Sequence, residues 1–224
     1  MFSLDERLSL CASFVRHGSK LADIGTDHAY LPIWLIENNV IESAVAADVR
    51  TGPLENARNN IIRYGAADKI KTVLSDGFKN IRSTDAEDIV MAGMGGELIV
   101  RLIDCTPWIF DKHKRLILQP MTRSNTLRRY LFEKGFDIID EKACISLGKA
   151  YSVMCCEYDG IIREPSLEAE YIGCLGGNTD NVSKRYISNV KHKLEFRIRG
   201  IDKGSKLYGE MSELIKKLND YTGE

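Results

Sequence analysis

Short apolar runs and helical stretches alternate strictly along residues 20–134, and this alternation constrains the fold more than any other feature. Runs typical of buried strands lie at residues 20–24, 45–48, 70–74, 88–92 and 115–118. Helical spacing precedes the first run at 3–16. It follows the first, second, fourth and fifth runs at 29–38, 53–64, around 98–102 and at 125–134. The alternation predicts a parallel sheet with helices on both faces and right-handed crossovers.

The pattern changes after residue 135. Residues 136–145 and 150–158 have the composition of two strands, joined by Leu147-Gly148-Lys149. A hairpin at this place would close the sheet with an antiparallel strand. The predicted fold class is therefore α/β, with a seven-strand Rossmann-like sheet whose last strand is antiparallel, which is not the usual dinucleotide-binding sheet.

A second composition shift near residue 161 predicts a small helical domain. A short helix is expected at 166–175, ended by the positive-φ residues of Gly176-Gly177-Asn178. Thr179 or Asp180 can cap the helix that follows. We therefore divide the chain into residues 1–160 and residues 161–224.

The 161–224 segment carries a heptad-like pattern. Between Ile187 and Leu218, ten positions follow one another at alternating steps of three and four, and eight of them are apolar or aromatic. This spacing predicts one long helix with a coiled-coil seam, weakened locally at Gly200 and Gly204. The partner of the seam can be the short helix, the 1–160 domain or a second subunit, so we expect a monomer or a weak dimer.

Bulk composition excludes several classes of protein. The chain is 44% hydrophobic, with a net charge of -1. It has no run of 18 apolar residues and no signal-like start in MFSLDERLSL, so we expect a cytoplasmic protein that does not span a membrane. The six cysteines form no C-x-x-C pair and no His cluster joins them, which favours buried free thiols over a metal site or disulfides.

Positive charge is concentrated near the C-terminus. Residues 184–206 hold eight basic and two acidic residues, a local excess of six positive charges. This segment is either a surface for a polyanion or a solvated helix face. Its basic residues are Lys184, Arg185, Lys191, Lys193, Arg197, Arg199, Lys203 and Lys206.

In an open parallel sheet, ligands bind at the carboxyl ends of the strands, so the loops there decide the function. Asp48 follows Gly25 by 23 positions, where a carboxylate can accept both hydroxyls of a ribose. Asp76, before Gly77, can accept the amino group of an adenine. NAD enzymes and S-adenosylmethionine enzymes share the acid that binds the ribose.

The first loop, DIGTDHAY, discriminates between these cofactors. A pyrophosphate needs a second glycine where this chain has Asp27. S-adenosylmethionine has no phosphate and carries an ammonium and a sulfonium group, which suit the carboxylates of Asp23 and Asp27. The loop therefore favours S-adenosylmethionine over NAD or a flavin.

Each of these residues also has a structural interpretation. Asp23 can orient backbone N–H groups, Asp27 can be a helix N-cap, and Asp76 can be an ordinary turn residue. His28 is better explained as an oriented loop residue than as a base, and Tyr30 can pack in the core.

The stretch MAGMGG is the most unusual loop. Gly93 and Gly95 flank Met94 and Gly96 follows, which would let a flat group approach the backbone closely. The alternative is a tight turn from strand to helix.

Five stretches of the chain, taken in order, resemble the bacterial tRNA adenine-N1 methyltransferases that modify adenine 22. They are LADIGTDHAYLP, AADVRTGPLENA, SDGF, MAGMGG and LILQPM. The resemblance covers residues 4–158 strongly and the helical part more loosely. It implies a Rossmann-like methyltransferase domain followed by a coiled-coil-like domain, S-adenosylmethionine as the methyl donor and tRNA as the acceptor.

The resemblance also implies roles for individual residues. Gly25, Asp27 and His28 would line the methionine part of the cofactor, Asp48 and Val49 the ribose, Asp76 and Gly77 the adenine, and Gly93 and Met94 the reacting methyl. With the acid and hydroxyl of the first loop, the expected cofactor-binding residues are Asp23, Gly25, Thr26, Asp27, His28, Asp48, Val49, Asp76, Gly77, Gly93 and Met94. The expected substrate-binding residues are Tyr30, Gly95, Gly96, Gln119, Pro120, Lys184, Arg185, Lys191, Lys193, Arg197 and Arg199.

Adenine N1 is already a lone-pair nucleophile, so the enzyme mainly has to place it in line with the methyl–sulfur bond, about 3 Å away. We expect Asp27, as the catalytic residue, or a carbonyl of residues 93–96 to stabilise the adenine as it gains charge. The base would be extruded from the tRNA, and the basic segment, with Arg7 and Arg16, would hold phosphates. The competing hypotheses are a methyltransferase of this fold for another RNA, a small molecule or a protein, and a non-enzymatic cofactor-binding or helical interaction module.

Overall fold

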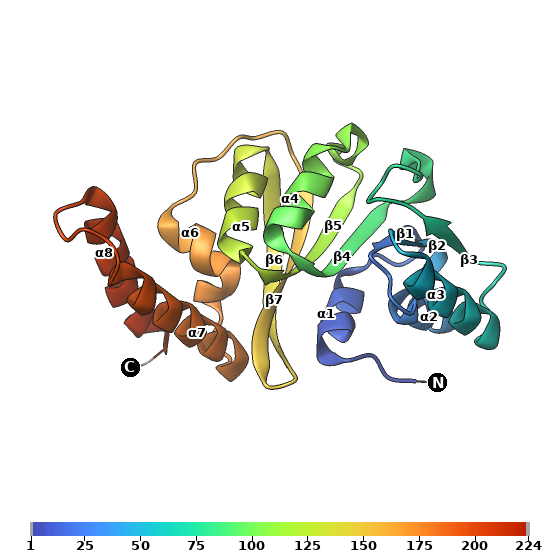
Figure 1. The fold of residues 1–224 in the computed structure, drawn as a ribbon, viewed down its shortest axis with the longest axis horizontal. Helices are drawn as coiled ribbons and strands as arrows, with labels where there is room; N and C mark the ends of the chain where they lie inside the picture. The colour runs from blue at the N-terminus through green and yellow to red at the C-terminus, as the bar shows by residue number, and fades with distance from the viewer. Residues whose placement is uncertain (1, 223–224) are drawn as a thin grey trace.

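The computed structural model describes residues 2–222, so residues 1, 223 and 224, at the outer ends of the two predicted domains, lie outside the described part. Seven strands form one sheet in the order β3-β2-β1-β4-β5-β7-β6 (Figure 1). The first five strands pair in parallel, and β7 is antiparallel to both β5 and β6, which confirms the predicted sheet. The strands are β1 Ser19–Ile24, β2 Ile41–Asp48, β3 Ile70–Leu74, β4 Asp88–Gly95, β5 Arg115–Thr122, β6 Phe136–Ser146 and β7 Lys149–Tyr158.

Helices cover both faces of the sheet, and each face has its own apolar core. Side chains of α1 (Glu6–Phe14), α2 (Tyr30–Glu37) and α3 (Thr51–Arg63) bury against one face. Side chains of α4 (Gly96–Asp104), α5 (Ser124–Glu133) and the short turn η2 (Pro107–Ile109) adjoin the other. A further short turn, η1 (Ser83–Asp85), precedes β4. Apolar side chains on both faces of the strands explain why the sequence shows continuous apolar runs rather than alternation.

Two strands extend further than predicted toward their carboxyl ends. β4 continues to Gly95 and β5 to Thr122, because Met94 pairs with Pro120 and Gly95 with Thr122. The register shifts between Ala92 and Met94, so Gly93 forms a bulge in the ladder. The MAGMGG stretch is therefore the bulged end of a strand rather than a free loop.

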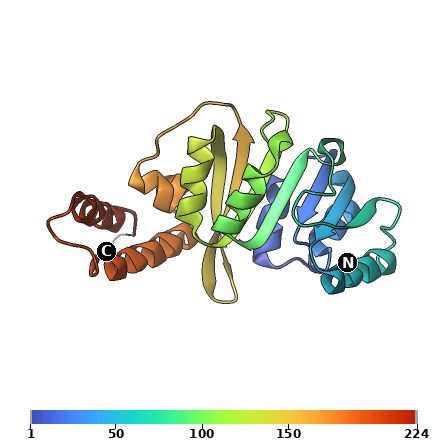
Figure 2. The same cartoon turned by 45° about the horizontal axis from the view of Figure 1, so that its top comes forward.

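The single long helix predicted for the C-terminal part is wrong. The chain forms α6 (Leu167–Ile172), η3 (Gly173–Gly177), α7 (Asn181–Ile198) and α8 (Lys206–Thr222), with a turn between α7 and α8 (Figure 2). Leu194 and Met211, from opposite sides of this turn, are buried in the same core. The apolar positions thus face each other within one antiparallel helical hairpin, and the two glycines lie in the turn where the helix is interrupted.

The end of α6 also differs from the prediction. Gly173, rather than Gly176 or Gly177, adopts a positive φ of 55°. A Cβ at Gly173 would collide with Glu141, so this position requires a glycine. Asp180 caps α7 by accepting hydrogen bonds from two backbone N–H groups, which confirms one of the two predicted caps.

Arg128, which belongs to a buried ion pair within the sheet domain, also links that domain to α6 and α7. The side chains of Arg128 on α5 and Glu141 on β6 are both fully buried, and Arg128 Nη2 lies 2.6 Å from Glu141 Oε1. Arg128 Nη1 donates to the carbonyls of Glu170 and Tyr171 at 2.9 and 3.0 Å, and Nη2 donates to the Tyr186 hydroxyl at 3.1 Å. Burial alone would lower the pKa of Arg128, but Glu141 more than offsets this effect and the pKa is raised. The arginine therefore stays charged inside the protein.

The remaining composition-based expectations concern cysteines and membranes. All six cysteines are free thiols; four are buried, whereas Cys105 and Cys174 are exposed. Within residues 2–222, no helix has the length and apolar character needed to cross a bilayer.

Candidate cofactor and substrate site

The loops after β1 and β2 are held together at the carboxyl edge of the sheet. The backbone N–H groups of Gly25 and Thr26 both donate to the carbonyl of Ala47, at 2.8 and 2.9 Å. Gly25 has a φ of 77°, and a Cβ there would collide with the Met94 side chain. The first turn therefore packs directly against the end of β4, as the predicted site requires.

Two buried carboxylates lie at this junction. Asp23 is 7% exposed and Asp48 is 6% exposed. Burial raises the pKa of Asp23 to about 6; a hydrogen bond with Thr26 lowers it and the charge of Asp48 raises it further. Asp48 accepts a hydrogen bond from the backbone N–H of Arg50 at 2.8 Å. Two acids so close together are stabilised by a bound cation, which fits the charge of S-adenosylmethionine and not that of a pyrophosphate.

Asp27, His28 and Tyr30 form the exposed rim of the first loop. The N-cap of α2 is Ala29, with a φ of 54°, so the interpretation of Asp27 as a helix cap is wrong. The Asp27 side chain is 64% exposed, and its carboxylate lies 3.3 Å from His28 Nε2. The His28 ring stacks on Tyr30, with the centroids 5.2 Å apart. Tyr30 is 39% exposed rather than buried in the core, so all three side chains are accessible to ligands.

The residues predicted to hold the ribose and adenine lie at the ends of β2 and β3. Val49 is 61% exposed. Asp76 lies 2.7 Å from Lys79 Nζ, and this ammonium group lowers the pKa of the Asp76 carboxyl. Gly77 has a φ of 61° and packs against Leu102 of α4. Asp76 is therefore ionised at neutral pH and accessible, although Lys79 competes for it.

Gln119 supports the Gly93 bulge within β4 rather than facing solvent. Its side chain is fully buried, and its Oε1 accepts hydrogen bonds from Gly93 N at 3.0 Å and from Arg7 Nη1 at 2.8 Å. Its Nε2 donates to the carbonyl of the adjacent Pro120 at 3.2 Å. The sequence placed Gln119 at the correct edge of the sheet, but it carried no signal for this bracing role.

The other two glycines of MAGMGG allow close packing. A Cβ at Gly96 would approach the backbone of Arg123, and one at Gly95 would lie 3.3 Å from Thr122 Oγ1. These two positions therefore support the tight-turn interpretation, whereas Gly93, with its φ of 79°, is the exposed one.

A groove of about 920 Å³ begins beside Pro120 and runs between α5, the β6–β7 turn and α7. Figures 1 and 2 show the β6–β7 turn protruding between α1 and α7 at this edge. Three of the predicted basic residues line the groove, together with basic residues that the sequence did not single out. The predicted residues are Arg185, Lys193 and Arg197, and the additional ones are Arg123, Lys149 and His192.

The other predicted basic residues lie elsewhere. Lys191 is 6% exposed and donates to Asn219 Oδ1 on α8 at 2.9 Å. Lys184 and Arg199 are not among the residues that line the groove. Helical periodicity explains the division, because residues of one helix at different spacings point to different sides.

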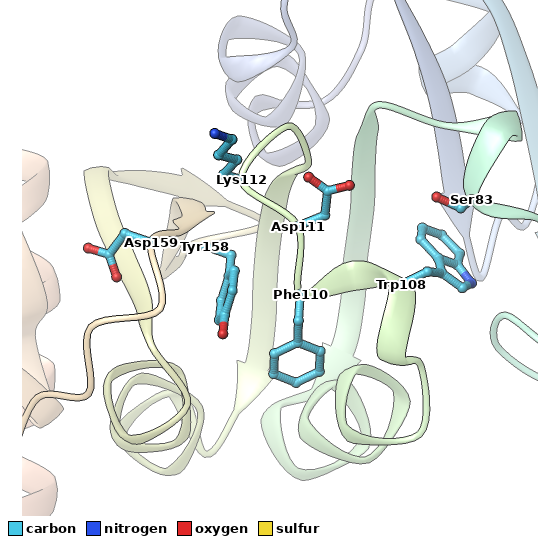
Figure 3. A pocket seen from close by; sticks show the side chains of 7 residues that line it. All are labelled: Ser83, Trp108, Phe110, Asp111, Lys112, Tyr158 and Asp159. Atoms are coloured by element: carbon cyan, nitrogen blue, oxygen red, sulfur yellow. The ribbon is translucent and has the colours of Figure 1, made fainter.

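Arg16, expected near the site, lies at the opposite edge of the sheet. Its Nε donates to Asp88 Oδ1 at 2.7 Å, and Asp88 is the first residue of β4. A cavity of about 440 Å³ lies at the same edge, between Trp108, Phe110 and Tyr158 (Figure 3). Neither feature adjoins the loops at the carboxyl ends of β1, β2 and β4. Across the described residues, no group of three or more His, Cys, Asp or Glu side chains could hold a metal ion.

Comparison with known proteins agrees with this geometry. Residues 4–154 match the family model described as "Methyltransferase domain". The tRNA (adenine(22)-N(1))-methyltransferase of Bacillus subtilis is 33% identical over 165 residues, which cover 70% of this chain and 69% of the relative.

Solved structures extend the likeness to the whole chain. The B. subtilis m1A22 tRNA methyltransferase TrmK superposes with a TM-score of 0.84 at 25% identity, covering 99% of this chain and 100% of that one. Sp1610 of Streptococcus pneumoniae, a candidate tRNA (m1A22) methyltransferase solved with S-adenosyl-L-methionine, gives the same TM-score at 33% identity, again covering 99% and 100% of the two chains. This chain therefore belongs to the tRNA (adenine(22)-N(1))-methyltransferase family.

Proposed function

We propose that this protein transfers a methyl group from S-adenosylmethionine to N1 of adenine 22 in tRNA, in the cytoplasm. The observation that carries the proposal is the pair of buried carboxylates, Asp23 and Asp48, beside the positive-φ glycines Gly25 and Gly93. This arrangement suits a cationic cofactor that has a ribose. Family membership supports the reaction class, and the name of the B. subtilis relative supports the base and its position.

The cofactor, when bound, supplies an electrophilic methyl group on a positively charged sulfur. Asp23 would be ionised against the ammonium group of the cofactor's amino acid end, and Asp48 would accept the ribose hydroxyls. Asp76, at the end of the neighbouring strand, would accept the amino group of the cofactor's adenine. Gly93 would leave room for the ligand, since it is exposed and no side chain projects from it, whereas Gly25 lets the first turn pack against Met94.

The chain's remaining task is to place and stabilise the acceptor base. Adenine N1 needs no strong base to become nucleophilic, and His28 is engaged with Asp27 and Tyr30. The exposed Asp27 carboxylate would accept a hydrogen bond from the N6 amino group and stabilise the positive charge that the ring gains. Tyr30, on the same rim, would contact the extruded base.

The basic groove supports tRNA as the substrate. Arg185, Lys193 and Arg197 project from α7 into a groove that starts at Pro120, next to the proposed site of methyl transfer. Phosphates of a folded RNA would neutralise this charge, and contacts of this kind are read by shape rather than by sequence.

The test is a methylation assay with labelled donor and a tRNA transcript, compared with a transcript that carries guanine at position 22. We expect label only in the first transcript, mapped to adenine 22. Asp27→Asn at saturating cofactor should lower kcat roughly 100-fold, within the range of electrostatic stabilisation by one group. Glu42→Gln, at the opposite edge of the sheet, should leave kcat unchanged.

Equal labelling of both transcripts, or labelling of a protein or small molecule instead, would contradict the proposed substrate. An unchanged kcat for Asp27→Asn would remove its catalytic role and leave it as a binding residue.

A further inference from the structure

Helix α1 places Arg7 at the edge of the sheet where methyl transfer is proposed. Asp5 caps the helix by accepting a hydrogen bond from Leu8 N at 2.8 Å, and its second oxygen accepts one from Arg7 Nη2 at 3.0 Å. Arg7 Nη1 donates to Gln119 Oε1 at 2.8 Å. The guanidinium group is therefore held in place from two sides, yet 21% of the side chain remains exposed.

The arginine lies beside the loop proposed to border the reacting methyl. A Cβ built on Gly93 would lie 3.7 Å from Arg7 Nη1. Burial raises the pKa of the Cys144 thiol on β6 to about 11, and the nearby charge of Arg7 partly offsets this rise. Arg7 thus occupies the corner between the Gly93 bulge and the β6–β7 hairpin, whose turn also lines the basic groove.

A positive charge at this place is unfavourable for both reacting partners of the proposed reaction. The cofactor is cationic, and the adenine becomes cationic as it is methylated, so the arginine repels both. Asp5 compensates for only part of this charge, because the pair is partly solvated. The charge is favourable only toward an anion. The cofactor's own anion, its carboxylate, is expected at the first loop with the rest of its amino acid end, so the anions expected beside the Gly93 bulge and the hairpin are the phosphates of the RNA.

The guanidinium group has capacity for such a ligand. It carries five N–H groups, and the hydrogen bonds to Asp5 and Gln119 use two of them. The other three suffice for a bidentate contact with a phosphate, which arginine makes better than lysine does. We propose that Arg7 binds the backbone phosphate next to the methylated adenosine. This inference rests on the proposed function and extends it to a substrate-binding residue on α1.

The competing interpretation is that Arg7 only braces Gln119 and, through it, Gly93. The two roles predict different kinetics. A phosphate contact raises the KM for tRNA and leaves kcat at saturation and the Kd for S-adenosylmethionine unchanged. A bracing role changes kcat or the cofactor Kd and leaves the KM for tRNA and its salt dependence as they are.

The experiment combines Arg7 variants with transcripts that lack one backbone charge. Arg7→Gln should raise the KM for tRNA about 10-fold, the loss expected for a hydrogen bond to a charged group. The slope of log(kcat/KM) against log[salt] should fall by roughly 0.7–0.9. Arg7→Lys should recover part of the loss. Lys112→Gln removes one exposed charge at the opposite edge and should change neither quantity.

A methylphosphonate placed at the linkage 5′ or 3′ of adenine 22 removes one phosphate charge. At one of these linkages it should raise the KM of the unmodified protein about as much as Arg7→Gln does. The same substitution should then have little further effect on Arg7→Gln, because both changes delete one contact.

Additive effects at both linkages, or an unchanged KM for Arg7→Gln, would overturn the assignment of Arg7. If the unmodified protein fails to methylate the unmodified transcript, the proposed function itself is wrong, so the two failures are distinguishable.

Discussion

The buried ion pair between Arg128 and Glu141 offers the sharpest test of how the two parts of the molecule are joined. Replacing Arg128 by methionine keeps most of the side-chain volume and removes the charge. Glu141 is then left fully buried without its partner, and the carbonyls of Glu170 and Tyr171 each lose a donor. Removing one member of a buried pair typically costs about 3–5 kcal/mol.

The loss should be measured as the free energy of unfolding in urea, followed by circular dichroism. For a chain of this size, each kcal/mol shifts the melting temperature by roughly 2–4 °C, so Arg128→Met should melt about 10 °C lower. The double variant Arg128→Met, Glu141→Leu removes both charges. It should recover the part of the lost stability that is due to the unpaired carboxylate, whereas the carbonyls of Glu170 and Tyr171 still lack their donor. Arg82→Met breaks a pair whose arginine is 78% exposed, and should cost less than about 1 kcal/mol.

Two results would refute this reasoning. One is an Arg128→Met variant whose unfolding free energy lies within about 1 kcal/mol of the parent, because a buried carboxylate without its partner should destabilise the protein by more than that. The other is a double variant no more stable than the single one, since the penalty is attributed to the orphaned charge of Glu141.

Two further predictions concern the cofactor site. Because burial raises the pKa of Asp23 to about 6 in the free protein, the Kd for S-adenosylmethionine measured by calorimetry should fall about 10-fold between pH 5 and pH 7. Without cofactor, the same ionisation lowers the free energy of unfolding as the pH rises from the pKa of the unfolded chain, near 3.8, to that of the folded protein, about 6. Asp23→Asn should abolish both trends. A pH-independent Kd in the parent protein would contradict the assignment of Asp23. Gly25→Ala should weaken cofactor binding at least 10-fold, since its φ is 77° and its Cβ would collide with Met94. The matched control is Gly65→Ala, which has a φ of 66° but open space around the Cβ; equal cofactor affinity of the two variants would refute the steric argument.

Much of the site could be predicted because the carboxyl ends of parallel strands lie at the same edge of the sheet. Once the alternation of strands and helices is recognised, Asp23, Asp48 and Gly93 must come close together, whatever the details of packing. The structure brings them together through the hydrogen bonds from the Gly25 turn to Ala47 and through the contact between Gly25 and Met94.

The positions of Arg7 and Arg16 show where such prediction ends. Both lie on or next to α1, nine positions apart, and both are basic. Nine helical residues span about 13 Å, close to the length of a short strand, so the two guanidinium groups reach opposite edges of the sheet. The direction in which α1 crosses the sheet depends on packing against β4, β5 and the hairpin, and no local pattern encodes it.

The amino-acid sequence by itself determined the order of strands and helices, the reversed last strand and the acids and glycines at the carboxyl edge, because each follows from local periodicity and from the geometry of parallel sheets. Only the tertiary structure decided that the apolar seam closes on itself as α7 and α8, that Lys191 faces α8 while Lys193 lines the groove, and that Arg128 is buried. The physical reason is that apolar spacing specifies which face of a helix is buried but not what buries it. That choice depends on contacts between residues far apart in the chain.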